Sequence, residues 1–414
     1  MDFWKLPNGL TAVGERMPAI RTVSVGVWNH VGAMMEAPEE NGMSHLIEHM
    51  VFKGTQTRST RQLAAEMDQV GGNVNAFTAR DTTCYHATVI DEDLPRAVDL
   101  LADLTLNPVF DPEELEKERG VVLDEIAMAE DDPEDVVSEL LNSAQFGGTP
   151  VGLPVLGPAE QVERYSRDAL IGYRRRHYAP ERCVVSVAGN YDPAQVEDLL
   201  QRIFGAWRSE ASPLSPAAYT PSEGVALARE KDTEQLHLAL GYPGIPFGDD
   251  RAIALNIMNT VLGGAMSSRL FQRIREELGM AYSVYSYAGG GEGFGAFSLY
   301  AGVAPKNGRR VLDEMLAQAR LIRDEGITPE EFAQAKHQLR IGYLMGLESS
   351  SARMMALGRS QLILGRCRTP DEVLSRVDAV TPNDVAEISQ RILSARPCLA
   401  AVGPGAETYL EGWQ

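Results

Sequence analysis

Residues 45–49 of this 414-residue chain read His45-Leu46-Ile47-Glu48-His49. Two residues four positions apart project from the same face of a helix, so both imidazoles would point in one direction. Histidines at this spacing are suited to bind a single Zn²⁺ ion. Glu48 precedes the second histidine, where its carboxylate could take a proton from the attacking water beside the metal. The stretch therefore predicts a helix that carries two zinc ligands and a general base.

Capping residues place the helices around this motif. Asn41-Gly42 opens the helix that carries His45 to about Phe52. Ser59 is a favourable N-cap for the next helix, and Gly71-Gly72 is a favourable end for it. The sequence therefore predicts two short helices, with the histidine motif in the middle of the first.

A catalytic zinc site needs a third protein ligand, and an acidic helix further along the chain offers candidates. Asp111-Pro112-Glu113-Glu114 combines an N-cap, a first-turn proline and an acidic first turn, and the helix is predicted to run to about Glu130. Glu118 and Glu125 are seven residues apart, so they share one helix face about 10 Å apart. One could bind zinc while the other supports the ligands from behind, and spacing alone does not choose between them.

The composition is that of a folded globular protein of two or more domains, with 44% hydrophobic and 23% charged residues. The formal net charge is −20, a field that repels nucleic acid and anionic membranes. No run of about 20 apolar residues is present, so no membrane span is expected. We therefore expect neither nucleic acid nor a membrane among the partners.

Cysteine usage and the N-terminus bear on the compartment. The four cysteines are scattered without a C-x-x-C pair, which indicates free thiols rather than disulfides or a cysteine zinc site. The first residues lack a basic region followed by an apolar stretch, so no signal peptide is expected. These features predict a cytoplasmic protein of bacterial type, with the mitochondrial matrix as the alternative.

The chain reads as two related halves. A strand pattern at 22–27 is matched by one at 235–240, and the pattern at 183–189 is matched by one at 398–403. Both pairs are separated by nearly the same number of residues, which indicates a duplicated domain. A segment rich in Pro, Ser and Ala lies between the halves and reads as a linker.

These observations predict two homologous α+β domains at 1–210 and 222–414, with a linker at 211–221. Each half mixes helical and strand patterns without regular βαβ alternation. This pattern is typical of a mostly antiparallel sheet that is covered by helices on one face.

Four stretches resemble the pitrilysin or insulinase family of zinc metallopeptidases. They are HLIEHMVFKGT (45–55), GGNVNAFT (71–78), EKERGVVLDEI (116–126) and LGGAMSSRLF (262–271). The resemblance covers nearly the whole chain, and at this length it points to the two-domain branch that includes the mitochondrial processing peptidase β subunit and its bacterial relatives. It implies a zinc endopeptidase, with one Zn²⁺ per chain, that acts on unfolded peptides.

The resemblance also implies roles for individual residues. Glu125 would join His45 and His49 as the third zinc ligand, with Glu48 as general base and Glu118 as a second acid near the metal. Peptide substrate would add to an edge strand, and a pocket just after the scissile bond would be lined by one aromatic residue. The positions that match these substrate-binding features are Asn75, Ala76 and Phe77 for the strand and Phe52 for the pocket.

In the second half, Arg275 and Tyr282 match a family pair that holds the substrate carbonyl and the oxyanion. A cation and a phenol donor suit developing negative charge. In two-domain relatives the domain that faces the zinc belongs to a partner subunit. We therefore expect a homodimer in which each chain is half of a clamshell chamber that dimerisation completes, and in which Arg275 and Tyr282 act in trans.

Asp135 and Glu139 lie four residues apart, on one helical face, and match acids that grip an arginine two residues before the cut in the processing peptidase β subunit. They suggest a preference for Arg near the cut.

The long glycine-rich loop of the α subunit is reduced here to residues 262–266, which argues against dedicated presequence processing. The alternative function is a non-catalytic capture or structural core subunit on the same fold, whose zinc motif is usually eroded.

Overall fold

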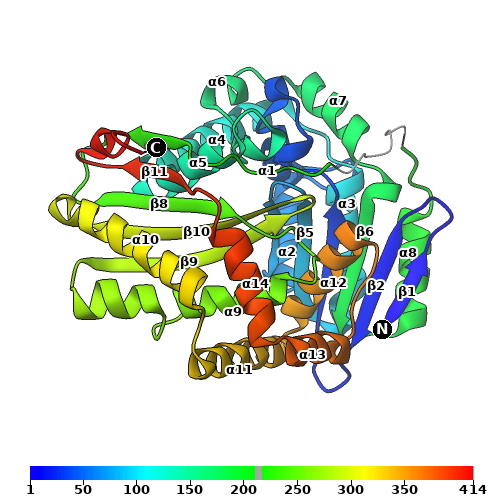
Figure 1. Cartoon of the computed structure of the whole chain (residues 1–414). Helices are drawn as coiled ribbons and strands as arrows, with labels where there is room; N and C mark the ends of the chain where they lie inside the picture. Colours follow the sequence, from blue (N-terminus) through cyan, green and yellow to red (C-terminus); the bar gives the residue numbers. More distant parts are fainter. Residues whose placement is uncertain (210–216, 414) are drawn as a thin grey trace. The chain divides into compact units, whose positions relative to one another are not determined.

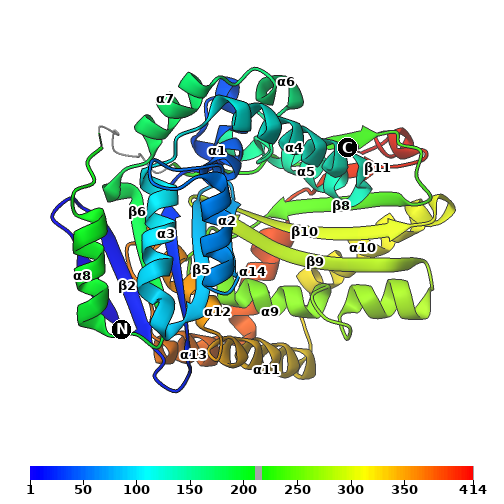
Figure 2. The same cartoon turned by 180° about the vertical axis from the view of Figure 1, so that it is seen from behind.

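The computed structural model describes residues 1–209 and 217–413, which form two compact units (Figures 1 and 2). Each unit contains one segment from the opposite half of the sequence. The first unit comprises Met1–Ile126, the described residues from Leu153 to 209, and Leu344–Thr369. The second comprises Ala127–Gly152, the described residues from 217 to Tyr343, and those from Pro370 to 413. Residues 211–216 of the predicted linker lie outside the described chain, so the predicted boundary there stays a prediction.

The first unit is built on a six-stranded sheet in the order β1-β2-β6-β3-β5-β4. Its strands pair antiparallel except for β2 with β6. The central strand β3 is buried along nearly its whole length, while β4 is an edge strand. The strands are β1 (Asp2–Lys5), β2 (Thr11–Arg16), β3 (Thr22–Asn29), β4 (Val74–Thr78), β5 (Thr83–Ile90) and β6 (Cys183–Gly189).

Helices pack on one face of this sheet and enclose the main core of the unit. Leu46, Ile47 and Met50 belong to this core with Leu101 and Val25, and all five are fully buried. Figure 2 shows α2 and α3 in front of β5 on this side. The helices are α1 (Met43–Val51), α2 (Thr60–Gln69), α3 (Leu94–Leu106), α4 (Pro112–Asp131), α6 (Ala159–Val162), α7 (Arg167–His177) and α8 (Pro193–Phe204), of which α4 extends into the second unit.

The predicted helix ends around the histidine motif are confirmed. Gly42 is the N-cap of α1 and has a left-handed φ of 93°, a conformation that favours glycine. Ser59 caps α2 in a capping box with Gln62. The carboxylate of Asp111 accepts hydrogen bonds from the amides of Glu113 and Glu114 at the start of α4.

The second unit has a five-stranded sheet in the order β7-β11-β8-β10-β9. The predicted repeat is confirmed, because β8 and β11 occupy the same places in this order as β3 and β6 in the first sheet. Its strands are β7 (Ala226–Arg229), β8 (Leu236–Pro243), β9 (Ala281–Gly291), β10 (Phe294–Val303) and β11 (Cys398–Val402). Its helices include α9 (Ala252–Leu262), α10 (Gly308–Glu325), α11 (Pro329–Gly346), α13 (Pro370–Ala379), α14 (Pro382–Leu393) and a π-helix at Phe271–Glu277.

The second face of each sheet is covered by a helix from the other half of the sequence. Helix α12 (Ser350–Leu364) packs on β3, β6 and β2 of the first unit (Figure 1). Met354 and Leu357 are buried there against Trp28. Helix α5 (Pro133–Phe146) packs on β8 and β11 of the second unit, where Val137 and Leu141 are buried. The predicted α+β class with two related domains is therefore confirmed, and the two exchanged helices are an addition to it.

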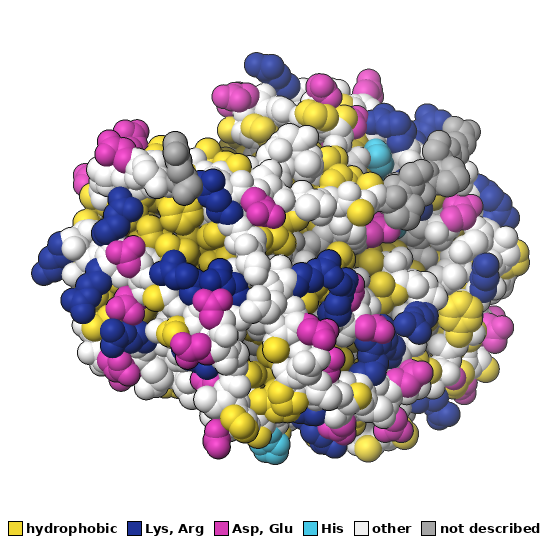
Figure 3. Space-filling model, viewed as in Figure 1, with side chains coloured by type: hydrophobic (Ala, Val, Ile, Leu, Met, Phe, Trp, Pro, Cys, Tyr) yellow, Lys and Arg dark blue, Asp and Glu magenta, His cyan; other side chains and the backbone are white. Residues whose placement is uncertain are grey.

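The surface carries charges of both signs. Figure 3 shows acidic and basic side chains interspersed on the face that it displays. Within residues 1–209 and 217–413, no helix combines the length and the apolar character that a membrane span requires.

Candidate functional site

The two histidines of α1 meet a carboxylate of α4 in the first unit. Oε2 of Glu125 lies 3.5 Å from Nε2 of His45 and 3.4 Å from Nε2 of His49. One ligand atom from each of the three residues lies within 4.8 Å of the others. Ligand atoms bound about 2.0–2.1 Å from a tetrahedral Zn²⁺ are separated by roughly 3.4 Å, so the observed spacing fits this metal.

The start of α1 is fixed by a buried carboxylate. Glu36 accepts hydrogen bonds from the amides of Gly42 and Ser44 at 2.8 and 2.7 Å, and from the side chain of Asn41 at 2.9 Å. Burial raises the pKa of Glu36, although these three donors lower it in part. The first turn of the helix, which includes His45, is thereby held in place.

The histidines differ in their surroundings. His45 is 9% exposed, and burial together with the nearby His49 lowers its pKa to about 4. Its imidazole is therefore neutral at pH 7, which is the form that binds a metal. Nδ1 of His49 lies 3.2 Å from Oε2 of Glu118, a carboxylate contact that orients the ring.

Glu118 lies behind the three candidate ligands and is buried. Its second oxygen, Oε1, lies 2.7 Å from the ammonium of Lys53. The carboxylate is thus held by a cation on one side and by His49 on the other. This arrangement corresponds to the support role that the sequence left open between Glu118 and Glu125, whereas one oxygen of Glu125 lies within 3.5 Å of Nε2 of both histidines.

Glu48 lies between the two histidines in sequence and is partly buried. Oγ1 of Thr78 donates a hydrogen bond to its Oε2 at 2.6 Å. Burial raises the pKa of Glu48, and the hydrogen bond from Thr78 opposes that rise. A carboxylate with a raised pKa accepts a proton more readily, as a general base requires.

The predicted substrate strand is β4, the edge strand of the first sheet. Asn75 is exposed, and its Oδ1 accepts a hydrogen bond from the amide of Ala76 at 2.8 Å. Phe77 packs edge-on against Trp28, with ring centroids 5.8 Å apart. Phe52 follows α1 as its C-cap and is half-buried, 6.5 Å from the ring of Tyr85.

Arg275 and Tyr282 lie in the second unit and contact each other. Nη1 of Arg275 donates to the carbonyl of Tyr282 at 3.0 Å, and its guanidinium lies 4.6 Å from the centre of the Tyr282 ring. The phenol is 77% exposed. Both residues line an open pocket of about 310 Å³ with Gly263, Phe271 and Tyr285. The π-helix that carries Arg275 is a feature that is frequent at functional sites.

Asp135 and Glu139 lie on the exposed side of α5, also in the second unit. Burial and then the charges of Asp132 and Glu134 raise the pKa of Asp135. The beginning of α5 is fastened to the second sheet because the hydroxyl of Tyr285 donates to Glu134 at 2.5 Å.

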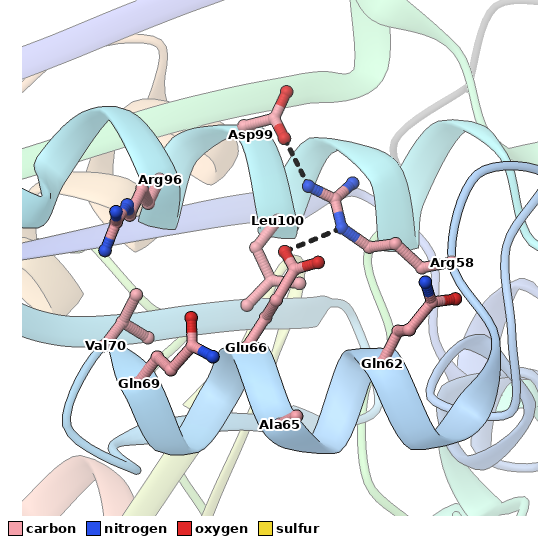
Figure 4. Close-up of a pocket in the computed structure, with 9 residues that line it drawn as sticks. All are labelled: Arg58, Gln62, Ala65, Glu66, Gln69, Val70, Arg96, Asp99 and Leu100. Atoms are coloured by element: carbon pink, nitrogen blue, oxygen red, sulfur yellow. Dashed lines mark hydrogen bonds and ion pairs between the residues drawn. The ribbon is translucent and has the colours of Figure 1, made fainter.

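A hollow of about 360 Å³ lies between α2 and α3 in the first unit (Figure 4). Arg58 crosses its rim and bonds Glu66 of α2 at 2.9 Å and Asp99 of α3 at 2.5 Å. It also reaches the buried carboxylate of Asp103 at 2.8 Å. Because the guanidinium already has three carboxylate partners, we interpret this cluster as a brace between the two helices.

Three residues of the site were not identified from the sequence, namely Glu36, Lys53 and Thr78. Lys53 lies within the motif stretch 45–55 and Thr78 ends the stretch 71–78, where a charged or hydroxyl side chain beside the metal motif is the available signal. Glu36 precedes α1 by a loop, and its acidic side chain before a glycine N-cap gives no comparable signal.

Comparison with known proteins assigns the family. Residues 11–159 match the model described as insulinase, peptidase family M16, and residues 164–339 match the peptidase M16 inactive domain. An uncharacterized zinc protease of Streptomyces coelicolor is 40% identical, with 96% of this chain and 88% of the relative covered. The uncharacterized zinc protease YmxG of Bacillus subtilis is 39% identical, with 96% and 97% covered.

Solved structures show the same fold. The crystal structure of a protease from Helicobacter pylori has a TM-score of 0.91 at 20% identity and covers 97% of this chain and 99% of that one. A peptidase M16 inactive domain from Pseudomonas fluorescens has a TM-score of 0.90 at 18% identity, with 97% and 98% covered. With two family models matched in succession and relatives near 40% identity along nearly its whole length, the chain belongs to the M16 insulinase family of zinc proteases.

Proposed function

We propose that this chain is a zinc-dependent endopeptidase that cleaves unfolded peptides. The observation that carries the proposal is the meeting of His45, His49 and Glu125 with a base, Glu48, on the same helix as the two histidines. A non-catalytic capture or core subunit is not favoured, since all four of these groups are present.

One Zn²⁺ per chain is proposed at these three ligands, with Glu118 supporting His49. When bound, zinc supplies a Lewis acid that polarises the scissile carbonyl and makes water a better nucleophile. Glu48 is the group that takes the proton of that water and later delivers it to the leaving amine. The hydrogen bond from Thr78 engages one carboxylate oxygen of Glu48 and leaves the other for this transfer.

The substrate is proposed to add to β4 as a further strand. An edge strand offers main-chain groups to an extended peptide, so recognition would favour unfolded segments over folded proteins. The amide of Ala76 is bonded to its neighbour Asn75 and would exchange this local partner for the peptide. Phe52 is the candidate for a pocket that receives the side chain after the cut.

Arg275 and Tyr282 are proposed to hold the substrate carbonyl and the developing oxyanion. The contact between guanidinium and phenol ring fixes both groups before substrate arrives. We further propose that they act in trans in a homodimer whose two chains form a chamber. Asp135 and Glu139 are proposed to favour an arginine near the cut.

The four free cysteines support the expectation of a reducing compartment, for which we propose the cytoplasm.

The test is hydrolysis of a quenched fluorescent peptide of about 15 residues with one internal arginine. The intact chain is compared with Glu48→Gln at equal zinc content, because the amide keeps the shape of the side chain but cannot accept the proton. Loss of cleavage in the variant with zinc retained supports a metallopeptidase with Glu48 as base. Absence of cleavage by the zinc-loaded intact chain would instead favour the capture-subunit function.

A further inference from the structure

Glu48, the proposed general base, is bonded to a residue of β4, the strand to which substrate is proposed to add. Thr78 is the last residue of β4, and Glu48 lies in the last turns of α1, 30 residues earlier in the chain. Their side chains meet through the 2.6 Å hydrogen bond from Oγ1 of Thr78 to Oε2 of Glu48. One hydroxyl therefore links the edge strand to the catalytic helix.

An ionised carboxylate has no proton to donate, so the hydroxyl of Thr78 is the donor in this hydrogen bond. Oγ1 of Thr83 lies 3.4 Å from Oγ1 of Thr78 and donates its own proton to the carbonyl of Val31 at 2.9 Å. The carboxylate oxygen of Glu48, at 2.6 Å, is thus the nearer of the two possible acceptors for the proton of Thr78. A hydroxyl bonded to an ionised carboxylate makes one of the shorter and stronger hydrogen bonds in proteins, at about 2.5–2.7 Å.

We propose that Thr78 is a positioning residue that fixes the rotation of the Glu48 carboxylate, an inference that rests on the proposed peptidase function. The terminal torsion of a glutamate is broad, so the carboxylate of an unrestrained Glu48 would rotate among several orientations. Proton transfer requires the accepting oxygen to lie within hydrogen-bond reach of the water. Thr78 holds Oε2 and thereby keeps Oε1 in one orientation.

The position of Thr78 gives this contact a second consequence. Residues Asn75 to Phe77, the proposed peptide-binding strand, directly precede it in β4. A peptide that adds to this strand orders the backbone that carries the hydroxyl. The strand that receives the substrate and the hydroxyl that orients the base thus belong to the same element. Because the hydroxyl contacts Glu48 rather than the peptide, its removal should lower kcat and leave KM unchanged.

The experiment compares Thr78→Val with Thr78→Ser in the full zinc-loaded chain. Valine keeps the β-branched shape that suits a strand and removes only the hydroxyl, whereas serine keeps the hydroxyl. For Thr78→Val we expect kcat to fall on the order of ten- to a hundredfold, the range of one hydrogen bond to a charged group. KM and the zinc dissociation constant, measured by competition with a chelator, should stay within about twofold. Thr78→Ser should recover kcat to within about threefold of the intact chain.

A matched control is Thr88→Val on β5, which removes a hydroxyl that lies 2.8 Å from that of Ser24 in the same sheet. It should leave kcat and KM unchanged. If Thr78→Val does not fold, as judged by circular dichroism, Thr78→Ala takes its place in the same comparison.

The outcomes separate this inference from the function on which it rests. The positioning role would be overturned by an unchanged kcat in Thr78→Val or by an equal loss of kcat in Thr78→Ser. It would also be overturned if the loss of kcat came with a comparable rise in KM or in the zinc dissociation constant. In each of these cases the peptidase function would stand. A zinc-loaded intact chain that cleaves no peptide would overturn the proposed function and this inference together.

Discussion

The ammonium of Lys53 lies 2.7 Å from Oε1 of Glu118, the buried carboxylate behind the candidate zinc ligands. Because Oε2 of the same carboxylate lies 3.2 Å from Nδ1 of His49, the cation is connected to a ligand through one intermediate. A carboxylate on Nδ1 favours the tautomer that leaves Nε2 unprotonated for a metal. We therefore expect Lys53 to influence zinc binding without being a ligand.

Replacement of Lys53 by methionine should weaken zinc binding about tenfold, because Glu118 loses the partner that fixes it against His49. The zinc dissociation constant is measured by competition with a chelator. Lys117→Met provides the control, since Lys117 pairs with Glu114 on the exposed side of α4. Equal zinc affinity in the two variants would contradict the proposed support of His49.

Mixing two inactive variants tests action in trans. Glu48→Gln lacks the base and Tyr282→Phe lacks the phenol donor, so each homodimer should be inactive. If the two functions come from different chains, mixed dimers contain one intact site and activity should recover toward about a quarter of the normal level per chain. Refolded or coexpressed mixtures are assayed with the fluorescent peptide. No recovery, although exchange of subunits is demonstrated, would place both groups within one chain.

Asp135→Asn combined with Glu139→Gln should lower kcat/KM on the order of tenfold for a peptide with arginine two residues before the cut, because the guanidinium loses its charge-assisted partners. The same peptide with norleucine in that position serves as the internal control and should be cleaved at an unchanged rate. An equal loss of kcat/KM for both peptides would mean that Asp135 and Glu139 do not recognise the arginine side chain.

The stability of the zinc-free protein should fall as the pH drops from about 7 to 5. Burial and then the charges of Arg176 and Arg182 lower the pKa of His177 from its ordinary value of about 6.5 to about 4. The unfolded chain therefore binds a proton in this window that the folded chain excludes, so the contribution is complete above pH 6.5 and is lost as the pH falls toward 4. His45 contributes in the same direction.

His177→Phe should reduce this pH dependence by on the order of 1 kcal/mol between pH 7 and 5, discounted for the partial exposure of the ring. Phenylalanine can keep the stacking on Tyr173, whose ring centroid lies 4.1 Å away, and it removes a buried Nδ1 that lacks a hydrogen-bond partner among the described residues. Urea unfolding of the metal-free protein at the two pH values gives the free energies. If the free energy of unfolding changed equally between the two pH values in the variant and the parent, His177 would be excluded as the origin of the pH dependence.

Local signals in the sequence were sufficient to predict where the helices around the candidate metal site begin. Gly42, Ser59 and Asp111 each begin a helix for a reason that involves only the next few residues, and all three are N-terminal caps in the structure. The histidine spacing depends on one helix alone. The repeat was visible because strands in equivalent places of the two sheets have similar patterns.

Contacts between elements that are distant in the sequence could not be predicted from local signals. The face of α12 that packs on the first sheet includes Ser350, Arg353 and Gly358, so it carries no apolar stripe that would reveal a buried helix. Gly358 is there because a side chain would overlap the indole of Trp28, and Arg353 pairs with Glu15 of β2. The link from Thr78 to Glu48 is likewise formed only by the fold, since it joins a strand to a helix.

The exchange of α12 has a consequence for how the protein matures. Because synthesis proceeds from the N-terminus, β2, β3 and β6 have left the ribosome long before residues 350–364 are made. Until α12 is made, one face of the first sheet lacks the helix that covers it in the folded chain. Trp28 and Val184, which are buried with α12 in the structure, would then be exposed to solvent. We therefore expect the first unit to complete its fold only after residues 350–364 have been made.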